Sequence, residues 1–262
     1  MGSTTSNNSF LDQHRIKGIL LYGPPGTGKT HLSRAIAKES GATMLSVDSA
    51  TLVNKYIGEK EKHIKAAFSL ASRLSPCLIF LDEVDALFYD RRTAEKSWER
   101  SAITQFLLEL DGLVNNDKAP FVIVATNRPW DLDAAFLRRL PQKVPMMLPD
   151  VEARSKILKV IVKSEDLDPL VDIEALARET DGCSGSDLRN LCSETALMWA
   201  IEQSKKRRGK EISSLDFEKM RLNSKHFTKA LQKIRPSVSK ECLLEFEEFI
   251  NRFNPPLNQV WF

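Results

Sequence analysis

Residues Gly23–Thr30 combine the residue types that bind a phosphate group. They read GPPGTGKT, a glycine-rich segment that ends in a lysine and a hydroxyl side chain. Glycines let backbone N–H groups turn inward around a phosphate, Lys29 can reach its terminal oxygens, and Thr30 offers a ligand to Mg²⁺. The segment follows a strand-like run and precedes a helical pattern, as such a loop requires. We therefore predict a nucleotide-binding loop rather than a glycine-rich turn without function.

A second candidate site follows the apolar run Leu78–Leu81, which ends in Asp82 and Glu83. A buried parallel strand would deliver Asp82 to the sheet edge that carries the phosphate loop, where it could hold Mg²⁺ through water. Glu83 could then polarise the water that attacks a γ-phosphate. Alone, this pattern is weak evidence, because a helix cap is an alternative interpretation. With the phosphate loop upstream, it predicts Mg²⁺-dependent ATP hydrolysis.

The elements that would position these residues alternate between short apolar runs and longer helical patterns. This alternation predicts an α/β fold, a parallel sheet wrapped by helices, over residues 17–149. The expected strands are Gly18–Tyr22, Thr43–Val47, Cys77–Leu81, Phe121–Thr126 and Lys143–Met147.

Beyond Asp150 the strand-like runs stop, and 3.6-residue spacing of apolar residues predominates. We predict a small all-helical lid subdomain over residues 150–262. Asp150, and Ser184 with Asp187, are suited to cap the first turns of its helices. The expected helices are Val151–Ser164, Ile173–Glu179, Ser186–Ser204, Ser224–Ile234 and Lys240–Phe253.

The composition indicates a soluble globular protein, with 42% hydrophobic and 28% charged residues. The formal charge of +3 gives no electrostatic footprint for nucleic acid or anionic lipid. No apolar run approaches the roughly 18 residues of a spanning helix. The four cysteines lack paired spacing and are interpreted as reduced packing residues in a cytosolic compartment.

The N-terminal residues 1–16 are expected to be disordered or a remnant of recombinant expression. Gly2 with Ser6 also satisfies the N-myristoylation pattern. Only 22 residues precede Gly23. The family resemblance given below implies a longer segment there, so the chain is expected to be an excerpt or a shortened product, and a membrane anchor upstream stays open.

From Lys17 onward the sequence resembles the AAA family of ATPases. The resemblance rests on three signatures in order: Gly23–Thr30, Phe80–Asp85 (FLDEVD) and Ala125–Pro129 (ATNRP). It implies ATP and Mg²⁺ as ligands. It assigns nucleotide contacts to Gly23, Pro24, Pro25, Gly26, Thr27, Gly28, Lys29, Thr30 and His31, with Ile157, Gly185 and Ser186 in the lid, and Mg²⁺ to Thr30 and Asp82.

In the lid, the family pattern implies that Gly185 lets the backbone approach the nucleotide. Ile157 matches the position that packs on adenine. The alternative for Ile157 is ordinary lid core, since an isoleucine on a helix face usually packs on protein.

The resemblance assigns catalytic roles to Glu83, Lys29, Asn127, Arg138 and Arg139. Asn127 would be a polar sensor within reach of the γ-phosphate, or else a cap of the strand-to-loop turn. The arginine pair would project at the ATP of a neighbouring subunit, which requires a ring; the alternative is a solvated pair on a helix end. Related sequences often carry a second arginine pair where this one has Gln142–Val144. The division of work between Arg138 and Arg139 therefore stays open.

Tyr56 and Ile57 match the pore-loop position of protein-remodelling members. There, an aromatic side chain from each of six subunits grips an extended polypeptide without reading its sequence. The alternative for Tyr56 is a loop anchor. Tyr89–Glu99 could form a second pore segment or an ordinary solvated loop.

Within the family, Phe68–Pro76 and Leu137–Pro141 look most like ATPases that extract tail-anchored proteins from the mitochondrial outer membrane. The ending Trp261–Phe262 resembles their fungal mitochondrial relatives. This resemblance implies membrane-protein quality control at mitochondria by a cytosol-facing ring, a homo-hexamer formed with nucleotide that acts on a polypeptide substrate. The runner-up is a microtubule-severing ATPase, because spastin and katanin share the type of loop seen at Lys55–Glu59.

Two other classes stay open. A nucleic-acid motor would share the phosphate loop, but the main basic run, Lys205–Lys210, is better interpreted as solvated surface. A nucleotide-gated scaffold without turnover is disfavoured because Glu83, Asn127 and Arg138 are all present.

Overall fold

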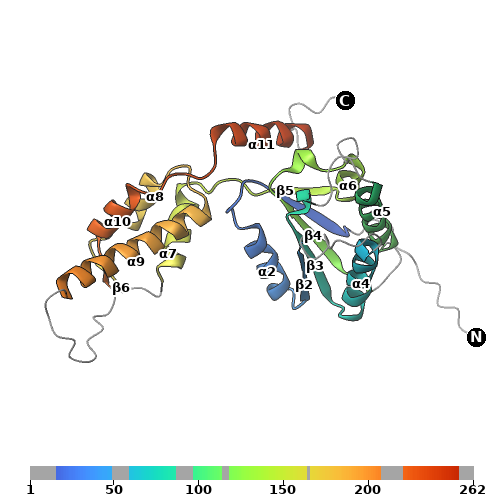
Figure 1. Cartoon of the computed structure of the whole chain (residues 1–262), viewed down its shortest axis with the longest axis horizontal. Helices are drawn as coiled ribbons and strands as arrows, with labels where there is room; N and C mark the ends of the chain where they lie inside the picture. The colour runs from blue at the N-terminus through green and yellow to red at the C-terminus, as the bar shows by residue number, and fades with distance from the viewer. Residues whose placement is uncertain are drawn as a thin grey trace, which may run out of the picture. The chain divides into compact units, whose positions relative to one another are not determined.

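The computed structural model describes residues 16–48, 59–86, 97–113, 118–163, 166–207 and 221–253. The chain divides into two compact units (Figure 1). The first comprises Met1–Gly23, Lys29–Met146 and Glu247–Phe262, and the second Pro24–Gly28 and Met147–Phe246. The subdomain boundary after residue 149 stays a prediction, and the grouping by contacts places Glu247–Phe262 with the first unit.

The first unit is built on a five-stranded sheet in which every neighbouring pair is parallel. Its order is β2-β3-β4-β1-β5. The three central strands, β3, β4 and β1, are mostly apolar along their length because a parallel sheet is covered on both faces, whereas the edge strand β5 is largely exposed. The strands are β1 Gly18–Tyr22, β2 Thr43–Asp48, β3 Cys77–Asp82, β4 Phe121–Thr126 and β5 Gln142–Pro145.

The strand register brings the ends of three strands to one sheet edge. Leu81 of β3 is paired with Val124 of β4, and Thr126 at the end of β4 is paired with Tyr22 at the end of β1. The residues that follow β1, β3 and β4 therefore leave the sheet at the same side. These are the phosphate loop, Glu83 and Asn127.

Helices cover both faces of this sheet, with α2 on one side and α4, α5 and α6 on the other (Figure 1). Leu32 and Ile36 of α2 pack on a core of strand residues that includes Phe80. On the opposite face the aromatic rings of Phe68, Phe106 and Phe136 are in contact. The helices are α2 Lys29–Glu39, α4 Glu59–Arg73, α5 Ser97–Gly112 and α6 Ala134–Arg139, with the short turns η1 Val84–Ala86 and η3 Pro129–Asp131.

The second unit is helical, with α7 Val151–Ile161, α8 Ile173–Glu179, α9 Gly185–Arg207 and α10 Ser224–Leu231. Asp150 and Asp172 cap α7 and α8, and Asn223 forms a capping box with His226 at the start of α10. One pair of two-residue strands, β6 Asp166–Leu167 and β7 Arg221–Leu222, interrupts the helices. The sequence pattern did not reveal it, because two residues are too few to show a period.

Helix α11, Lys240–Phe253, continues from the second unit into the first. In the first unit the ring of Phe249 meets that of Tyr22 edge-on, with centroids 5.0 Å apart, and Lys143 lies over the ring of Phe253. Burial raises the pKa of Tyr22 and lowers that of Lys143. The last helix thus packs on the strand that leads into the phosphate loop.

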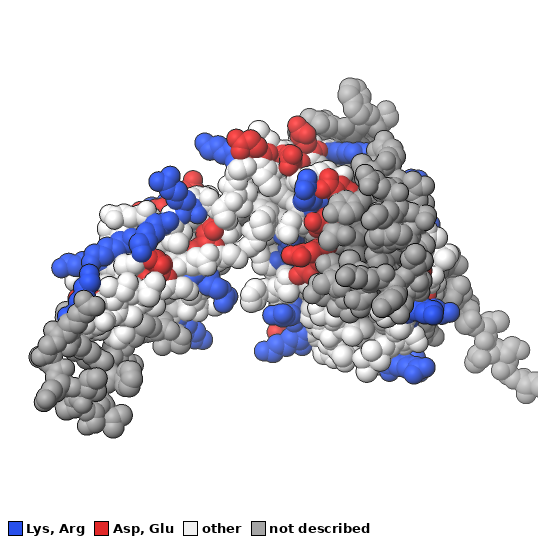
Figure 2. Space-filling view, viewed as in Figure 1, with Lys and Arg blue, Asp and Glu red and all other residues white. Residues whose placement is uncertain are grey.

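The surface carries charges of both signs. On the face in Figure 2, lysine and arginine side chains lie over both units, with acidic side chains among them. Among the described residues, no helix is long and apolar enough to span a bilayer.

Candidate nucleotide-binding site

The loop between β1 and α2 has the backbone conformation of a phosphate cradle. Gly26 and Gly28 have φ angles of 78° and 96°, a region that side-chain-bearing residues rarely adopt. An added Cβ at Gly26 would lie 2.7 Å from Ser184 Oγ, whereas at Gly28 it would meet nothing within 4 Å. Both positions therefore require glycine for their backbone conformation. At Gly26 the close approach of Ser184 also leaves no room for a side chain.

Lys29, the first residue of α2, is 7% exposed. Its Nζ donates a hydrogen bond to the carbonyl oxygen of Gly23, 2.8 Å away. Burial lowers the pKa of Lys29 to about 8, against the opposing influence of Asp82 and Asp85. A desolvated ammonium held against the loop backbone is the partner that a phosphate anion requires.

Thr30 and Asp82, far apart in sequence, meet in the structure. Thr30 Oγ1 donates to Asp82 Oδ2 at 2.7 Å, and the backbone N–H of Glu83 donates to Asp82 Oδ1 at 3.0 Å. Hydroxyl and carboxylate oxygens are the ligands that Mg²⁺ prefers. The pair therefore fits the predicted magnesium site.

Glu83 directly follows β3 and is exposed. Its φ angle is 52°, and among the described residues it is the only non-glycine with a positive φ. Such a conformation costs about 1–3 kcal/mol, and residues that keep it are concentrated at active sites. This backbone strain, which no sequence pattern shows, supports the catalytic role that we predict for Glu83.

Two residues without an assigned role connect the segments that follow β3 and β4. Thr126 Oγ1 donates to Asp85 Oδ1 at 2.7 Å and accepts from the N–H of Arg128 at 3.0 Å. These bonds flank Asn127, which is half-buried, and tie its turn to the segment that carries Glu83. Asp85 belongs to the Phe80–Asp85 signature, but no sequence pattern identifies Thr126 as its hydrogen-bond partner.

In the second unit the start of α9 meets the tip of the phosphate loop. The N–H of Ser186 donates to the carbonyl oxygen of Gly26 at 3.2 Å, and a Cβ on Gly185 would lie 3.1 Å from that oxygen. The structure thus brings together Gly185, Ser186 and Gly26, three of the predicted nucleotide contacts.

The buried carboxylate of Asp187 organises this start of α9. It accepts hydrogen bonds from the N–H and hydroxyl of Ser184 and from the N–H and hydroxyl of Ser237. Burial alone would raise the pKa of Asp187, but these four hydrogen bonds lower it overall. The sequence predicts the cap with Ser184, but no pattern in it indicates the contact with distant Ser237.

The remaining nucleotide contacts stay predictions. Ile157 is partly buried and packs on the core of the second unit, which agrees with the lid-core alternative without testing the adenine contact. His31 is exposed on α2. Tyr56, Ile57, Gly2 and the ending Trp261–Phe262 lie outside the described residues, as does most of Tyr89–Glu99.

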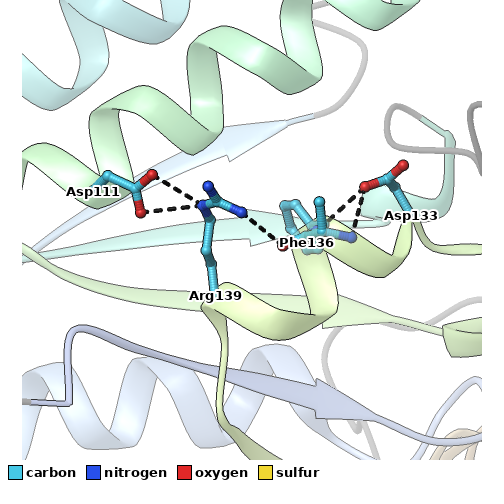
Figure 3. Close-up of polar contacts among 5 residues, drawn as sticks. Asp111, Asp133, Phe136 and Arg139 are labelled. Atoms are coloured by element: carbon cyan, nitrogen blue, oxygen red, sulfur yellow. Dashed lines mark hydrogen bonds and ion pairs between the residues drawn. The ribbon is translucent and has the colours of Figure 1, made fainter.

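The arginine pair occupies the last turn of α6. Arg139 Nε donates to both carboxylate oxygens of Asp111, at 3.1 and 3.0 Å, and Arg139 Nη1 donates to the carbonyl oxygen of Ala135 (Figure 3). Arg138 Nε donates to the carbonyl oxygen of Ala134 at 3.2 Å. Both arginines are exposed.

The sequence profile of the ATPase family associated with various cellular activities (AAA) matches residues 19–148. The solved AAA domain of FIGL-1 in complex with ADP superimposes with a TM-score of 0.76 and 32% identity, covering 91% of this chain and 78% of that one. The chain belongs to the AAA family of ATPases. Profiles of the AAA+ lid domain and of the Vps4 C-terminal oligomerisation domain match residues 170–219 and 202–253.

Longer relatives of this AAA chain include the cell division cycle protein 48 homolog of Archaeoglobus fulgidus, 40% identical over 91% of this chain. Human spastin is 43% identical over 87% of this chain. The chain spans 33% and 37% of these two relatives, about a third of their length. Membership of the family confirms the predicted fold and the predicted ligands, ATP and Mg²⁺.

Proposed function

We propose that this chain is the ATP-hydrolysing module of a ring that remodels proteins. The observation that carries the proposal is the convergence at the end of β3, where the Thr30–Asp82 hydrogen bond adjoins the strained backbone of Glu83. Nucleotide binding alone does not require a carboxylate on a strained backbone at this position. Hydrolysis does require a carboxylate there, to polarise the attacking water.

Each residue of this edge has a chemical task. Lys29 binds the terminal phosphate oxygens, and Thr30 with Asp82 holds Mg²⁺, which when bound neutralises charge on those oxygens. Glu83 accepts a hydrogen bond from the attacking water and polarises it. Asn127, on the turn held by Thr126, orients that water or the γ-phosphate.

Arg138 and Arg139 complete the site of a neighbouring subunit. Their guanidinium groups would stabilise the negative charge that develops on the transferred phosphoryl group. Neither arginine donates to a residue of its own phosphate loop in the described part of the chain. The match to an oligomerisation domain at residues 202–253 supports a homo-oligomer, and we propose a hexamer.

The proposed substrate is a polypeptide gripped by Tyr56 and Ile57 in the pore of the ring. For the whole protein, the sequence resemblance at Phe68–Pro76 and Leu137–Pro141 supports membrane-protein extraction at the cytosolic face of mitochondria. It is the sole support for that location, and the relatives described above add none.

Microtubule severing is the second candidate function. It is favoured by the 43% identity to human spastin over 87% of this chain, together with the spastin-like loop at Lys55–Glu59. Tubulin would then be the polypeptide on which the same ring acts. A nucleic-acid motor is less well supported, since acidic side chains lie among the basic ones on the face in Figure 2.

The test of hydrolysis is Glu83→Gln, with Glu152→Gln on the exposed side of α7 as the matched control. We expect Glu83→Gln to bind ATP, to form rings detectable by light scattering, and to lose about 10²–10⁴-fold in turnover. Glu152→Gln should hydrolyse ATP as the unmodified chain does. Equal turnover of both variants would refute the assignment.

The substrate is tested by adding candidate polymers to the unmodified chain. Stimulation of ATP hydrolysis by a fluorescent protein with an unstructured tail, and loss of its fluorescence, would support threading. Stimulation and shortening by microtubules would establish severing instead. Stimulation by single-stranded DNA alone would contradict both.

A further inference from the structure

Helix α6, which carries both arginines, is short. It is held by a cap at its N-terminus and by the packing of Phe136. The carboxylate of Asp133 accepts from the N–H groups of Ala135 and Phe136 and thereby caps the helix. The fully buried ring of Phe136 stacks on Phe106 of α5, with centroids 5.4 Å apart. These contacts hold the helix that carries Arg139 against α5, on which Asp111 lies (Figure 3).

Arg139 is held a second time, at its guanidinium group. Its Nε faces both oxygens of Asp111, and Nη1 donates to Ala135 O at 3.3 Å. In the described part of the chain, Nη2 has no hydrogen-bond partner. Nε and Nη1 of the guanidinium are thus held within the chain, while Nη2 can donate to a group outside it.

Arg138 is placed differently. Successive residues of an α-helix are about 100° apart around its axis, so the two side chains leave α6 in different directions. Within the described ranges, Arg138 forms no ion pair, and its one hydrogen bond runs to its own helix at Ala134. Among the residues that the structure describes, Arg139 is therefore the one of the pair whose side chain is bound by another element.

The position of Asp111 is otherwise unfavourable. It lies in the last turn of α5, where the helix dipole repels a carboxylate and where that turn has no basic residue to offset the repulsion. Arg139 supplies that missing positive charge. An acidic residue at this place is explained by the contact with α6, and not by α5 itself.

We propose that Asp111 is a positioning residue that orients Arg139 toward the nucleotide of the neighbouring subunit. This inference rests on the proposed function, in which the arginine pair acts in trans. Arg139 enters the ring with its side chain already ordered, whereas Arg138 must lose rotamer freedom when the ring closes. The two arginines therefore do unequal work, and the ordered one contributes more to turnover.

An exposed ion pair of this kind contributes little to stability by itself. The side chains of Arg139 and Asp111 are 37% and 54% exposed. Loss of Asp111 should therefore be visible in turnover on the neighbouring subunit and hardly at all in the melting temperature. That contrast separates positioning from a structural role.

The experiment mixes two subunits that are each inactive alone. The donor carries Glu83→Gln and intact arginines, and the acceptor carries intact Glu83 with Arg138→Ala and Arg139→Ala. Hydrolysis in the mixture then occurs only where a donor presents its arginines to an acceptor. Asp111→Asn is placed in the donor in one mixture and in the acceptor in another, with Glu109→Gln, on the same helix, as the charge-matched control.

We expect Asp111→Asn in the donor to lower kcat of the mixture about three- to fivefold, the size of one well-oriented exposed pair, with KM for ATP unchanged. In the acceptor, which lacks both arginines, it should have no effect. Glu109→Gln should have no effect in either subunit, and Asp111→Glu in the donor should restore part of the loss.

Equal losses in donor and acceptor would show a folding role and overturn the inference, as would no loss in the donor. A gain in turnover would overturn it too, because Asp111 would then restrain Arg139 rather than orient it. No activity in the mixture of unmodified donor and acceptor would refute action in trans, and with it the proposed function and this inference together.

Discussion

Asp82 in the first unit and Asp187 in the second each lie within the same unit as residues predicted to contact the nucleotide, but the two aspartates differ in how many hydrogen bonds they accept. Asp82 accepts from Thr30 and from the N–H of Glu83. Asp187 accepts from four donors, two on Ser184 and two on Ser237. A carboxylate offers about four lone-pair sites. All four bonds to Asp187 end on its Oδ2 and come from serines of the same unit, which indicates a structural role. Asp82 accepts one bond at each oxygen and so keeps capacity for a metal or its water.

The largest effect should follow from Asp82→Asn. We expect turnover to fall about 10²-fold or more, because an amide holds Mg²⁺ poorly, with little change in melting temperature. Steady-state hydrolysis and a thermal melt check this prediction. A variant that melts early and still hydrolyses ATP would reverse the roles assigned to the two aspartates.

Asp187→Asn should show the opposite pattern. The amide group of asparagine would face N–H and O–H donors, so the free energy of unfolding should fall by about 2–3 kcal/mol. Because the pKa of Asp187 is lowered in the folded chain, its contribution is present above the ordinary aspartate pKa and is lost as the pH falls through the lowered value. Urea unfolding at pH 7 and at pH 3 tests both points. Glu179→Gln, exposed at the end of α8, is the control that should change neither.

Lys29 offers a test through pH. Its pKa of about 8 means that the ammonium is charged at pH 7 and mostly neutral at pH 9. Bound phosphates would raise this pKa, so ATP affinity should weaken about tenfold between pH 7 and pH 9, with proton uptake on binding near pH 8. Calorimetry in buffers of different ionisation enthalpy measures the uptake.

Lys29→Arg should abolish this pH dependence whatever its affinity, because a guanidinium stays charged. If the unmodified chain binds ATP equally well at pH 7 and pH 9, the desolvated state of Lys29 is not the one that meets the phosphate.

The smallest effect should come from Thr126→Val, which keeps the side-chain shape but removes the hydrogen bonds to Asp85 and from the N–H of Arg128. Of these two, the bond to Asp85 reaches the segment that carries Glu83, and one hydrogen bond contributes about 1 kcal/mol, so we expect a loss of about fivefold in kcat with KM for ATP unchanged. A double-mutant cycle with Asp85→Asn should show coupling between the two residues. Additive effects would show that the turn around Asn127 is held by other contacts.

The sequence predicts the sheet and the phosphate loop well because their signals are local. Buried parallel strands such as Phe121–Thr126 are continuous apolar runs, and the phosphate loop needs glycines at fixed spacing. The expected strand Phe121–Thr126 has the bounds that the structure gives, and β3 extends the expected Cys77–Leu81 by the one residue, Asp82, that carries the chemistry.

What the sequence could not predict depends on contacts between distant segments. The pairing of Arg139 with Asp111 joins two helices whose relative position follows from the stacking of Phe106 on Phe136. The positive φ of Glu83 and the contact of Ser237 with Asp187 likewise arise only once the chain is folded. The family pattern assigned Arg139 a role, but only the structure shows what holds it.

The contact between Tyr22 of β1 and Phe249 of α11 has a consequence for how the chain is made. During synthesis the first strand leaves the ribosome long before the last helix. The face of the Tyr22 ring that Phe249 contacts therefore stays uncovered until residue 249 has left the ribosome. The core beneath the nucleotide loop can close only after nearly all of the described chain has been translated, which makes completion of the ATP site a late event in folding.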